Sequence, residues 1–193
     1  MANYTKKVLS FTLQELMKEK PLNDITVHEL VEKSSMNRKT FYYHFHNIAD
    51  LLKWTLYDNF LQLRQNPLST KTWTEHTKSL LCFISDHKYF FHSMRYSKYY
   101  AEMHLYLKEL MSGLFQEYEK ETWKIFEEKY HPSSPLKESH RNYIIKYFSG
   151  ALFTLIDEWF LTGMQESIDH FTDILKLLIS DSICNAYLAF CQS

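Results

Sequence analysis

The chain has 193 residues, of which 45% are hydrophobic and 17% aromatic, and its formal net charge is −1 at pH 7. This length suits one compact domain, or a small domain joined to a larger one. The three glycines and four prolines are few breakers, which favours long helices and argues against a sheet protein. The charge does not by itself indicate nucleic acid, although a small basic face on a neutral body is compatible with it.

A first amphipathic helix is expected near the start of the chain. It carries apolar residues at Val8, Phe11 and Leu16. Pro21 follows this segment and punctuates the chain there.

A second, short helix is expected from Val27 to Lys33. Thr26 can accept a backbone N–H at its start, and Glu29 completes a capping box. The buried face is defined by apolar residues at helical spacing, Val27, Leu30 and Val31.

A third helix is expected after a turn at residues 34–36, with Asn37 as its N-cap. Phe41 and Phe45 are four residues apart, so they share one face and are expected to be core residues. The remaining circumference is able to hydrogen-bond outward, through Arg38, Lys39, Thr40, Tyr42, Tyr43 and His44.

These two helices and their turn predict a helix-turn-helix that reads DNA. The second helix has the size and chemistry that the major groove admits, and the first residues of such a helix face base edges. Arg38 and Lys39 are therefore the first candidates for base or phosphate contact. The alternative is that these side chains form an ordinary solvated surface.

The same segment resembles the DNA-binding region of the TetR family of bacterial regulators. The family pattern is matched by Thr26-Val27, Leu30-Val31, Arg38, Thr40-Phe41-Tyr42 and His44-Phe45. The likeness continues into residues 47–52, which resemble the family's fourth helix, with Asn47 as N-cap and Asp50 closing a capping box.

The resemblance implies a role for each outward residue. Arg38 and Lys39 would lie deepest in the groove, and Thr26 would hold a phosphate. Phosphates or bases would also be touched by Thr40, Tyr42 and His44. The full set of expected DNA contacts is Thr26, Asn37, Arg38, Lys39, Thr40, Tyr42, Tyr43 and His44.

Three positions depart from the family pattern. Ser35 stands where a turn glycine is usual, so a non-glycine residue must take or avoid a positive φ there. Lys39 replaces another common glycine, which suggests a base or phosphate contact. Ile48 occupies a position where many members carry a lysine, so one phosphate contact would be missing.

An all-α fold of about nine helices is expected, with an N-terminal three-helix helix-turn-helix domain (residues 1–50) and a C-terminal helical bundle (residues 51–193) for dimerisation and effector binding. Pro67 follows the fourth helix. Further helical spacing predicts helices over residues 72–87, 88–94, 98–130, 142–162 and 167–189.

The last two helices carry large apolar residues on more than one side and are the expected subunit interface. Small residues at 149–151 would permit close approach of another helix, and the family resemblance implies a four-helix bundle with a second subunit. The expected interface residues are Phe148, Gly150, Leu152, Trp159, Leu175, Ile179 and Ile183. The alternative is that this apolar surface is intramolecular core.

A homodimer would present two reading helices to half-sites about 34–36 Å apart, so the expected partner is a palindromic double-stranded DNA operator. The effector, a small ligand or a partner protein, is not identified by the sequence. Residues 39–45 and 50–54 are similar to a subgroup of activators of dihydroxyacetone kinase operons, which would imply a partner protein and activation. Six aromatic residues and one methionine are candidates for either a pocket or core: Phe83, Phe90, Met103, Tyr106, Phe115, Trp123 and Trp159.

Other functional classes find little support in the sequence. No phosphate loop, nucleophile elbow or metal motif is present, so neither an enzyme, a cofactor nor a metal site is expected. Cys82, Cys184 and Cys191 show no metal spacing and are expected to be thiols in a reducing cytoplasm. No apolar stretch or signal peptide points to a membrane. The main alternative to a DNA-binding regulator is an all-helical interaction protein that retains the helix-turn-helix.

Overall fold

The computed structural model describes residues 2–63 and 72–191, which form helices and connecting turns with no strand. The chain divides into two compact units. The first comprises Met1–Gln62 and Asp86–Leu107, and the second comprises Leu63–Ser85 and Lys108–Ser193. The all-α fold class is therefore confirmed, while the expected division at residue 50 into two functional domains stays a prediction.

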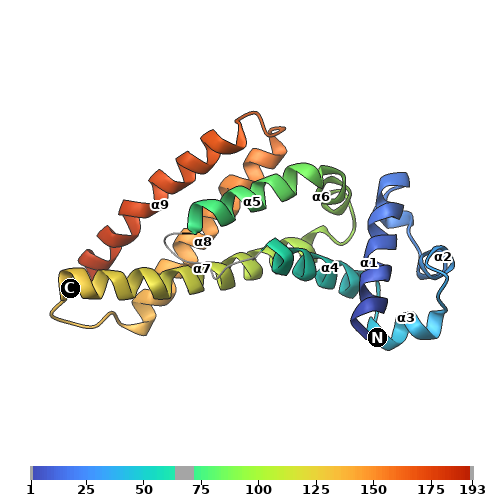
Figure 1. Ribbon diagram of the computed structural model, residues 1–193, viewed down its shortest axis with the longest axis horizontal. Coiled ribbons are helices and arrows are strands. Elements are labelled where there is room, and N and C mark those ends of the chain that lie inside the picture. The colour runs from blue at the N-terminus through green and yellow to red at the C-terminus, as the bar shows by residue number, and fades with distance from the viewer. Residues whose placement is uncertain (1, 64–71, 192–193) are drawn as a thin grey trace. The chain divides into compact units, whose positions relative to one another are not determined.

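The first unit is built around the N-terminal helices (Figure 1). Its elements are α1 (Ala2–Glu19), the 3-10 helix η1 (Leu22–Asp24), α2 (Val27–Lys33), α3 (Arg38–His44), α4 (Ile48–Leu63), α6 (Lys88–Arg95) and the start of α7 (Tyr100–Tyr130). α1 packs against α2, α3 and α6. Pro67, expected to follow the fourth helix, lies outside the described residues.

The core of the first unit is built mainly from aliphatic side chains and includes the fully buried ring of Phe41. Its fully buried side chains include Leu9, Leu13, Leu30, Phe41, Leu52 and Leu56. Phe11, one of the apolar residues of the expected amphipathic helix, is 65% exposed. Leu9, Leu13 and Leu16 continue at helical spacing and are buried, so Phe11, two residues from Leu9 and Leu13, points to another side.

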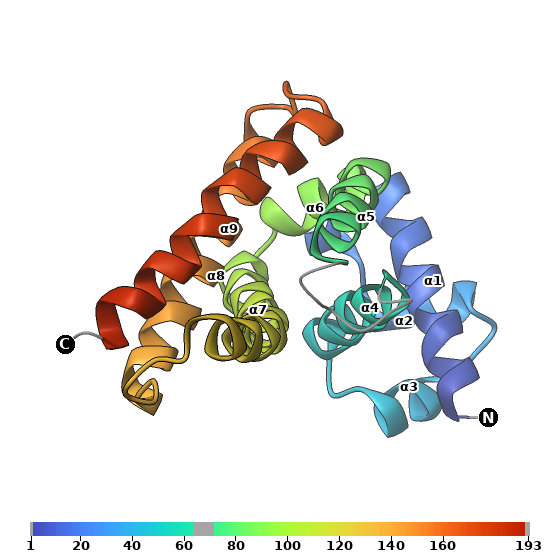
Figure 2. The ribbon, with the colours of Figure 1, turned by 60° about the vertical axis from the view of Figure 1, so that its left-hand side comes forward.

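The second unit contains α5 (Trp73–Asp86), the rest of α7, α8 (Glu138–Leu161) and α9 (Ile168–Cys191). α8 and α9 form a hairpin of packed helices (Figure 2). α8 begins at Glu138, four residues before the expected Asn142. Its first turn is polar and has no apolar periodicity, so the sequence pattern did not indicate this turn. α7 runs through Gly113 without interruption.

α9 is long and apolar enough to cross a membrane, judged by length and composition alone, and 24% of its most apolar window is buried. One face of α9 packs into the core of the second unit, through Phe171, Leu175, Ile179, Ile183 and Tyr187. A core helix of this kind passes the same test of composition, so the result is weak support for a membrane span. The side of α9 that faces away from this core is also apolar, and the described chain does not cover it.

Candidate nucleic-acid interface

The start of α2 is capped as its sequence predicts. Thr26 has extended backbone angles, and its side chain accepts a hydrogen bond from the Glu29 backbone N–H at 3.3 Å. The Glu29 carboxylate pairs with Lys20, and the pKa of Glu29 is lowered, first by the hydrogen bond from Lys20 and also by the Thr26 backbone. The first turn of α2 is therefore tied to the residue that follows α1.

The turn between α2 and α3 contains a non-glycine residue in the left-handed region. Ser35 has a φ of 55°. Its N–H donates to the Glu32 carbonyl at 3.1 Å, and the Met36 N–H donates to the Val31 carbonyl at 2.8 Å. This pair of bonds is the Schellman motif, in which the residue after the helix usually is glycine. Of the two possibilities that the sequence left open, Ser35 therefore takes the positive φ.

α3 begins at its predicted cap. The Asn37 side chain accepts from the Thr40 backbone N–H at 2.8 Å, and the Thr40 hydroxyl donates to the same oxygen at 3.1 Å. Phe41 is fully buried, and the ring of Phe45 is its neighbour, with centroids 5.9 Å apart. These anchors fix which side of α3 faces away from the core.

The outward side of α3 is basic and aromatic. Tyr43 is 81% and Tyr42 is 56% exposed. Arg38 and Lys39 are exposed, and Thr40 and His44 are half-buried. All the expected DNA contacts on α3 are therefore exposed or half-buried. Thr26 and Asn37, at the caps of α2 and α3, are exposed as well.

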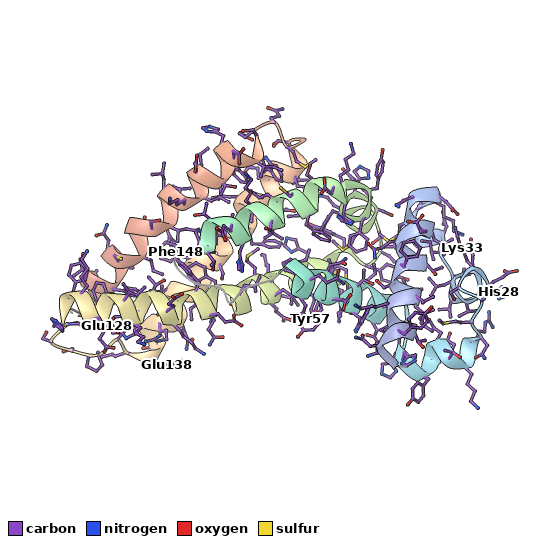
Figure 3. The ribbon with its side chains drawn as sticks, viewed as in Figure 1. His28, Lys33, Tyr57, Glu128, Glu138 and Phe148 are labelled. Atoms are coloured by element: carbon purple, nitrogen blue, oxygen red, sulfur yellow. The ribbon has the colours of Figure 1, made fainter. Side chains whose placement is uncertain are left out.

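The charges around α3 differ from those in the rest of the first unit. Four lysines form ion pairs: Lys18 with Glu15, Lys20 with Glu29, Lys33 with Glu19, and Lys53 with Glu102. Lys33 lies at the end of α2 (Figure 3). Within the described part of the chain, Arg38 and Lys39 have no ion pair. The positive charge of α3 is therefore available to an external anion.

The third departure from the family pattern has a structural reason. Ile48, at the start of α4, is 5% exposed and belongs to the core. α4 is instead capped by Asn47, whose side chain accepts from the Asp50 N–H at 3.0 Å. Asp50 accepts in turn from the His46 N–H at 3.1 Å. The two reciprocal bonds order the loop that joins α3 to α4.

The expected interface residues lie mostly inside the second unit. Six of them are buried within the single chain: Phe148, Leu152, Trp159, Leu175, Ile179 and Ile183. Trp159 also donates from Nε1 to the Glu166 carbonyl at 3.1 Å, which closes the turn between α8 and α9. Gly150 is half-buried, and a Cβ placed there would meet no atom within 4 Å.

Other side chains of α8 and α9 face outward and are apolar. Tyr143 is 66%, Tyr147 is 71% and Leu177 is 77% exposed, with Leu178 at 51%. A groove of about 520 Å³ runs between the two helices and is lined by Tyr143, Ile144, Tyr147, Phe148, Ser182, Asn185, Ala186 and Phe190. The exposed apolar residues of α8 and α9 are therefore a different set from the interface residues that the sequence predicted, and the interface itself stays a prediction.

The residues that were candidates for either a pocket or core lie mostly in the core, and the described residues show no metal site. The candidate rings Phe83, Phe90, Phe115, Trp123 and Trp159 and the side chain of Met103 are buried, and Tyr106 is half-buried. Phe115 stacks on Phe148 at 5.8 Å within the second unit. Among residues 2–63 and 72–191, no cluster of three or more histidine, cysteine or acidic side chains has metal-binding geometry.

Comparisons with known proteins identify the family. A TetR-type family model described as "Transcriptional regulator C-terminal region" matches residues 71–181, more than half of the chain. A curated relative is the "HTH-type dhaKLM operon transcriptional activator DhaS" of Lactococcus lactis subsp. lactis (strain IL1403), 24% identical over 87 residues. That match spans 45% of this chain and 46% of the relative, so it covers about half the length of each.

A solved structure shows the same fold over nearly the whole chain. The "Dihydroxyacetone kinase operon activator DhaS" superposes with a TM-score of 0.65 and 17% sequence identity, covering 93% of this chain and 96% of the other. Both matches are named as activators of an operon. The chain belongs to the TetR family of transcriptional regulators.

Proposed function

We propose that this regulator binds a palindromic double-stranded DNA operator through α2, its turn and α3. The observation that carries the proposal is the division of α3 into two sides. Phe41 and Phe45 fix one side in the core, while Arg38, Lys39 and Tyr43 stand exposed on the other. A short helix with this outward chemistry fits the major groove.

The outward residues have distinct proposed roles. Arg38 and Lys39, in the first turn of α3, would contact base edges and set specificity. Thr26, at the start of α2, would hold a phosphate. Tyr42, Tyr43, His44 and Thr40 would contact phosphates or bases, and Asn37 would present the helix start.

The active form in this proposal is a homodimer that uses the outer side of α8 and α9. Tyr147 and Leu177 leave a large apolar area exposed, and the open space beside Gly150 permits close approach of a second helix. A second copy would cover the uncovered side of α9, which explains its apolar composition without a membrane. The proposed site of action is the cytoplasm.

Control of DNA binding by an effector completes the proposal. A ligand or partner protein that prefers one separation of the two reading helices would shift the population toward that state, by no more than its differential affinity. The names of the relatives support activation of an operon as the output.

Selection of DNA from a random pool, followed by gel shift, tests the proposal. We expect the wild-type protein to enrich a short palindrome and to bind it saturably. Arg38→Ala and Tyr42→Ala should lose this binding, whereas Tyr89→Ala should retain it, since Tyr89 is an exposed tyrosine on α6. Binding that depends on salt but shows no sequence preference would contradict the proposal.

A further inference from the structure

We propose that the first turns of α1 form a second DNA-contacting face, in which Tyr4 and Lys7 bind backbone phosphates beside the groove that α3 enters. This inference rests on the proposed DNA binding by α3. It extends the contact surface to an element outside the helix-turn-helix.

Packing places the first turns of α1 next to α3. Lys6 Nζ lies 5.7 Å from the ring centroid of Phe45 and 6.0 Å from that of Trp54. Phe45 is the C-cap of α3, and Trp54 belongs to α4. Figures 1 and 2 both show the N-terminal end of α1 beside α3. The two elements are therefore held together within the first unit.

The inward position of Lys6 determines which neighbours face solvent. Tyr4 and Lys7 are three residues apart, so they share a side of the helix. Tyr4 is 74% exposed, and Lys7 and Asn3 are also exposed. This side offers a hydroxyl, an amide and an ammonium group, all of which can donate hydrogen bonds to phosphate oxygens.

The charge distribution favours an anionic partner at this place. Residues 1–14 and 33–49 contain no Asp or Glu, and the contact of Lys6 with Phe45 joins these two stretches. Farther along α1, Lys18 is paired with Glu15. Lys7 has no ion pair within the described ranges of the chain. A phosphate would therefore meet no competing carboxylate from these two stretches.

The chemistry of the face predicts affinity without base recognition. A lysine ammonium is a compact point charge, and phosphate contacts fix the position of a protein on DNA but carry no direct sequence information. Tyr4 and Lys7 should therefore strengthen binding to every DNA sequence by a similar factor. Arg38 should instead affect the ratio between operator and unrelated DNA.

The test compares Lys7→Gln with Lys18→Gln on the operator duplex that the wild-type protein selects from a random pool. Both variants remove one positive charge from the exposed side of the same helix. We expect Lys7→Gln to weaken binding about fivefold at 0.15 M salt and to lower the slope of log K against log salt by about 0.9. Tyr4→Phe should weaken binding while leaving this slope unchanged, because it removes no charge.

Each outcome decides a different point. If Lys7→Gln binds operator and unrelated DNA as tightly as Lys18→Gln does, with the same salt slope, the inference is overturned while the proposed function stands. If the wild-type protein selects no DNA sequence, the proposed function itself fails. A loss confined to operator DNA would also contradict the phosphate role, since a backbone contact cannot distinguish sequences. Unchanged circular dichroism and Tm would show that the variants are folded.

Discussion

Arg141 donates from Nη1 to Oε2 of Glu119 at 2.8 Å, although the Glu119 side chain is wholly buried. The Tyr187 hydroxyl donates to the other carboxylate oxygen at 3.2 Å. The Arg141 guanidinium also lies 5.6 Å from the ring centroid of Trp123. These contacts link α7, α8 and α9 through one buried carboxylate, so the packing of the last three helices depends on its charge state.

Removal of the cation should be costly. Arg141→Met leaves the Glu119 carboxylate buried without its charged partner, and we expect it to lower the free energy of unfolding by about 3 kcal/mol. Glu119→Gln combined with Arg141→Met should recover part of this loss, because no buried charge remains. Urea unfolding at a fixed protein concentration measures both. A double variant as unstable as the sum of its single changes would show that the two side chains do not interact.

The same carboxylate should make stability depend on pH. Burial raises the pKa of Glu119 above its ordinary value of 4.5, and Arg141 opposes this shift only in part. Between the unfolded and folded pKa values the folded state holds more protons, so the free energy of unfolding should fall as pH rises through that window. Above the folded pKa, the full cost of burying the charged carboxylate lowers the free energy of unfolding.

Comparison of Glu119→Gln with wild type across this pH range isolates the effect. The wild-type protein should gain stability relative to Glu119→Gln as pH is lowered toward the ordinary value of a glutamate. The exposed change Glu109→Gln, on the same helix, should follow the wild-type curve. Parallel curves for all three proteins would contradict the assignment to Glu119.

Local sequence signals predicted the helix-turn-helix closely, because the ends of α2 and α3 depend on residues that are near in sequence. Thr26 and Asn37 cap α2 and α3 as expected, and α2 has the predicted bounds. Ser35 stands where a glycine is usual, and it takes the positive φ that the sequence left as one of two possibilities. Each of these features is decided by hydrogen bonds between residues a few positions apart: side chain to backbone at the two caps, and backbone to backbone at the turn.

The face that each long helix buries was harder to predict. α8 and α9 carry apolar residues on opposite sides, and periodicity alone does not say which side meets its own chain. Phe148 and Leu177 both suit a buried position, yet Phe148 is 5% and Leu177 is 77% exposed. The choice depends on the packing partners in the folded unit, which are distant in sequence.

The division of α3 into two sides predicts opposite effects at adjacent positions. Phe41→Ala removes a fully buried ring and should lower the free energy of unfolding by about 3–5 kcal/mol. Tyr42→Ala removes an exposed ring and should change stability by less than about 0.5 kcal/mol while abolishing operator binding. Thermal unfolding and gel shift on the same preparations distinguish them. Retained operator binding by Tyr42→Ala would refute its role as a contact.

Introducing charge on the outer side of α9 should separate the proposed dimer. Leu177→Glu would bury a carboxylate against the partner helix, so we expect the dimer dissociation constant to rise at least about tenfold. Ile125→Glu, at an exposed apolar position of α7, is the matched control. Sedimentation velocity over a range of protein concentrations measures the change. A wild-type protein that stays monomeric would remove the basis for this interface.

Relief of the backbone strain at Ser35 should stabilise the helix-turn-helix. Its φ of 55° costs a non-glycine residue about 1 kcal/mol, and glycine adopts this angle without a steric penalty. Ser35→Gly should therefore raise the free energy of unfolding by a few tenths to about 1 kcal/mol, the unfolded chain's greater freedom offsetting part of the gain. Ser34→Gly is the control, because Ser34 has a φ of −84° and its hydroxyl donates to the Val31 carbonyl at 3.2 Å. Ser34→Gly should lower stability, and a loss of similar size in Ser35→Gly would show that the left-handed turn carries no strain that glycine can relieve.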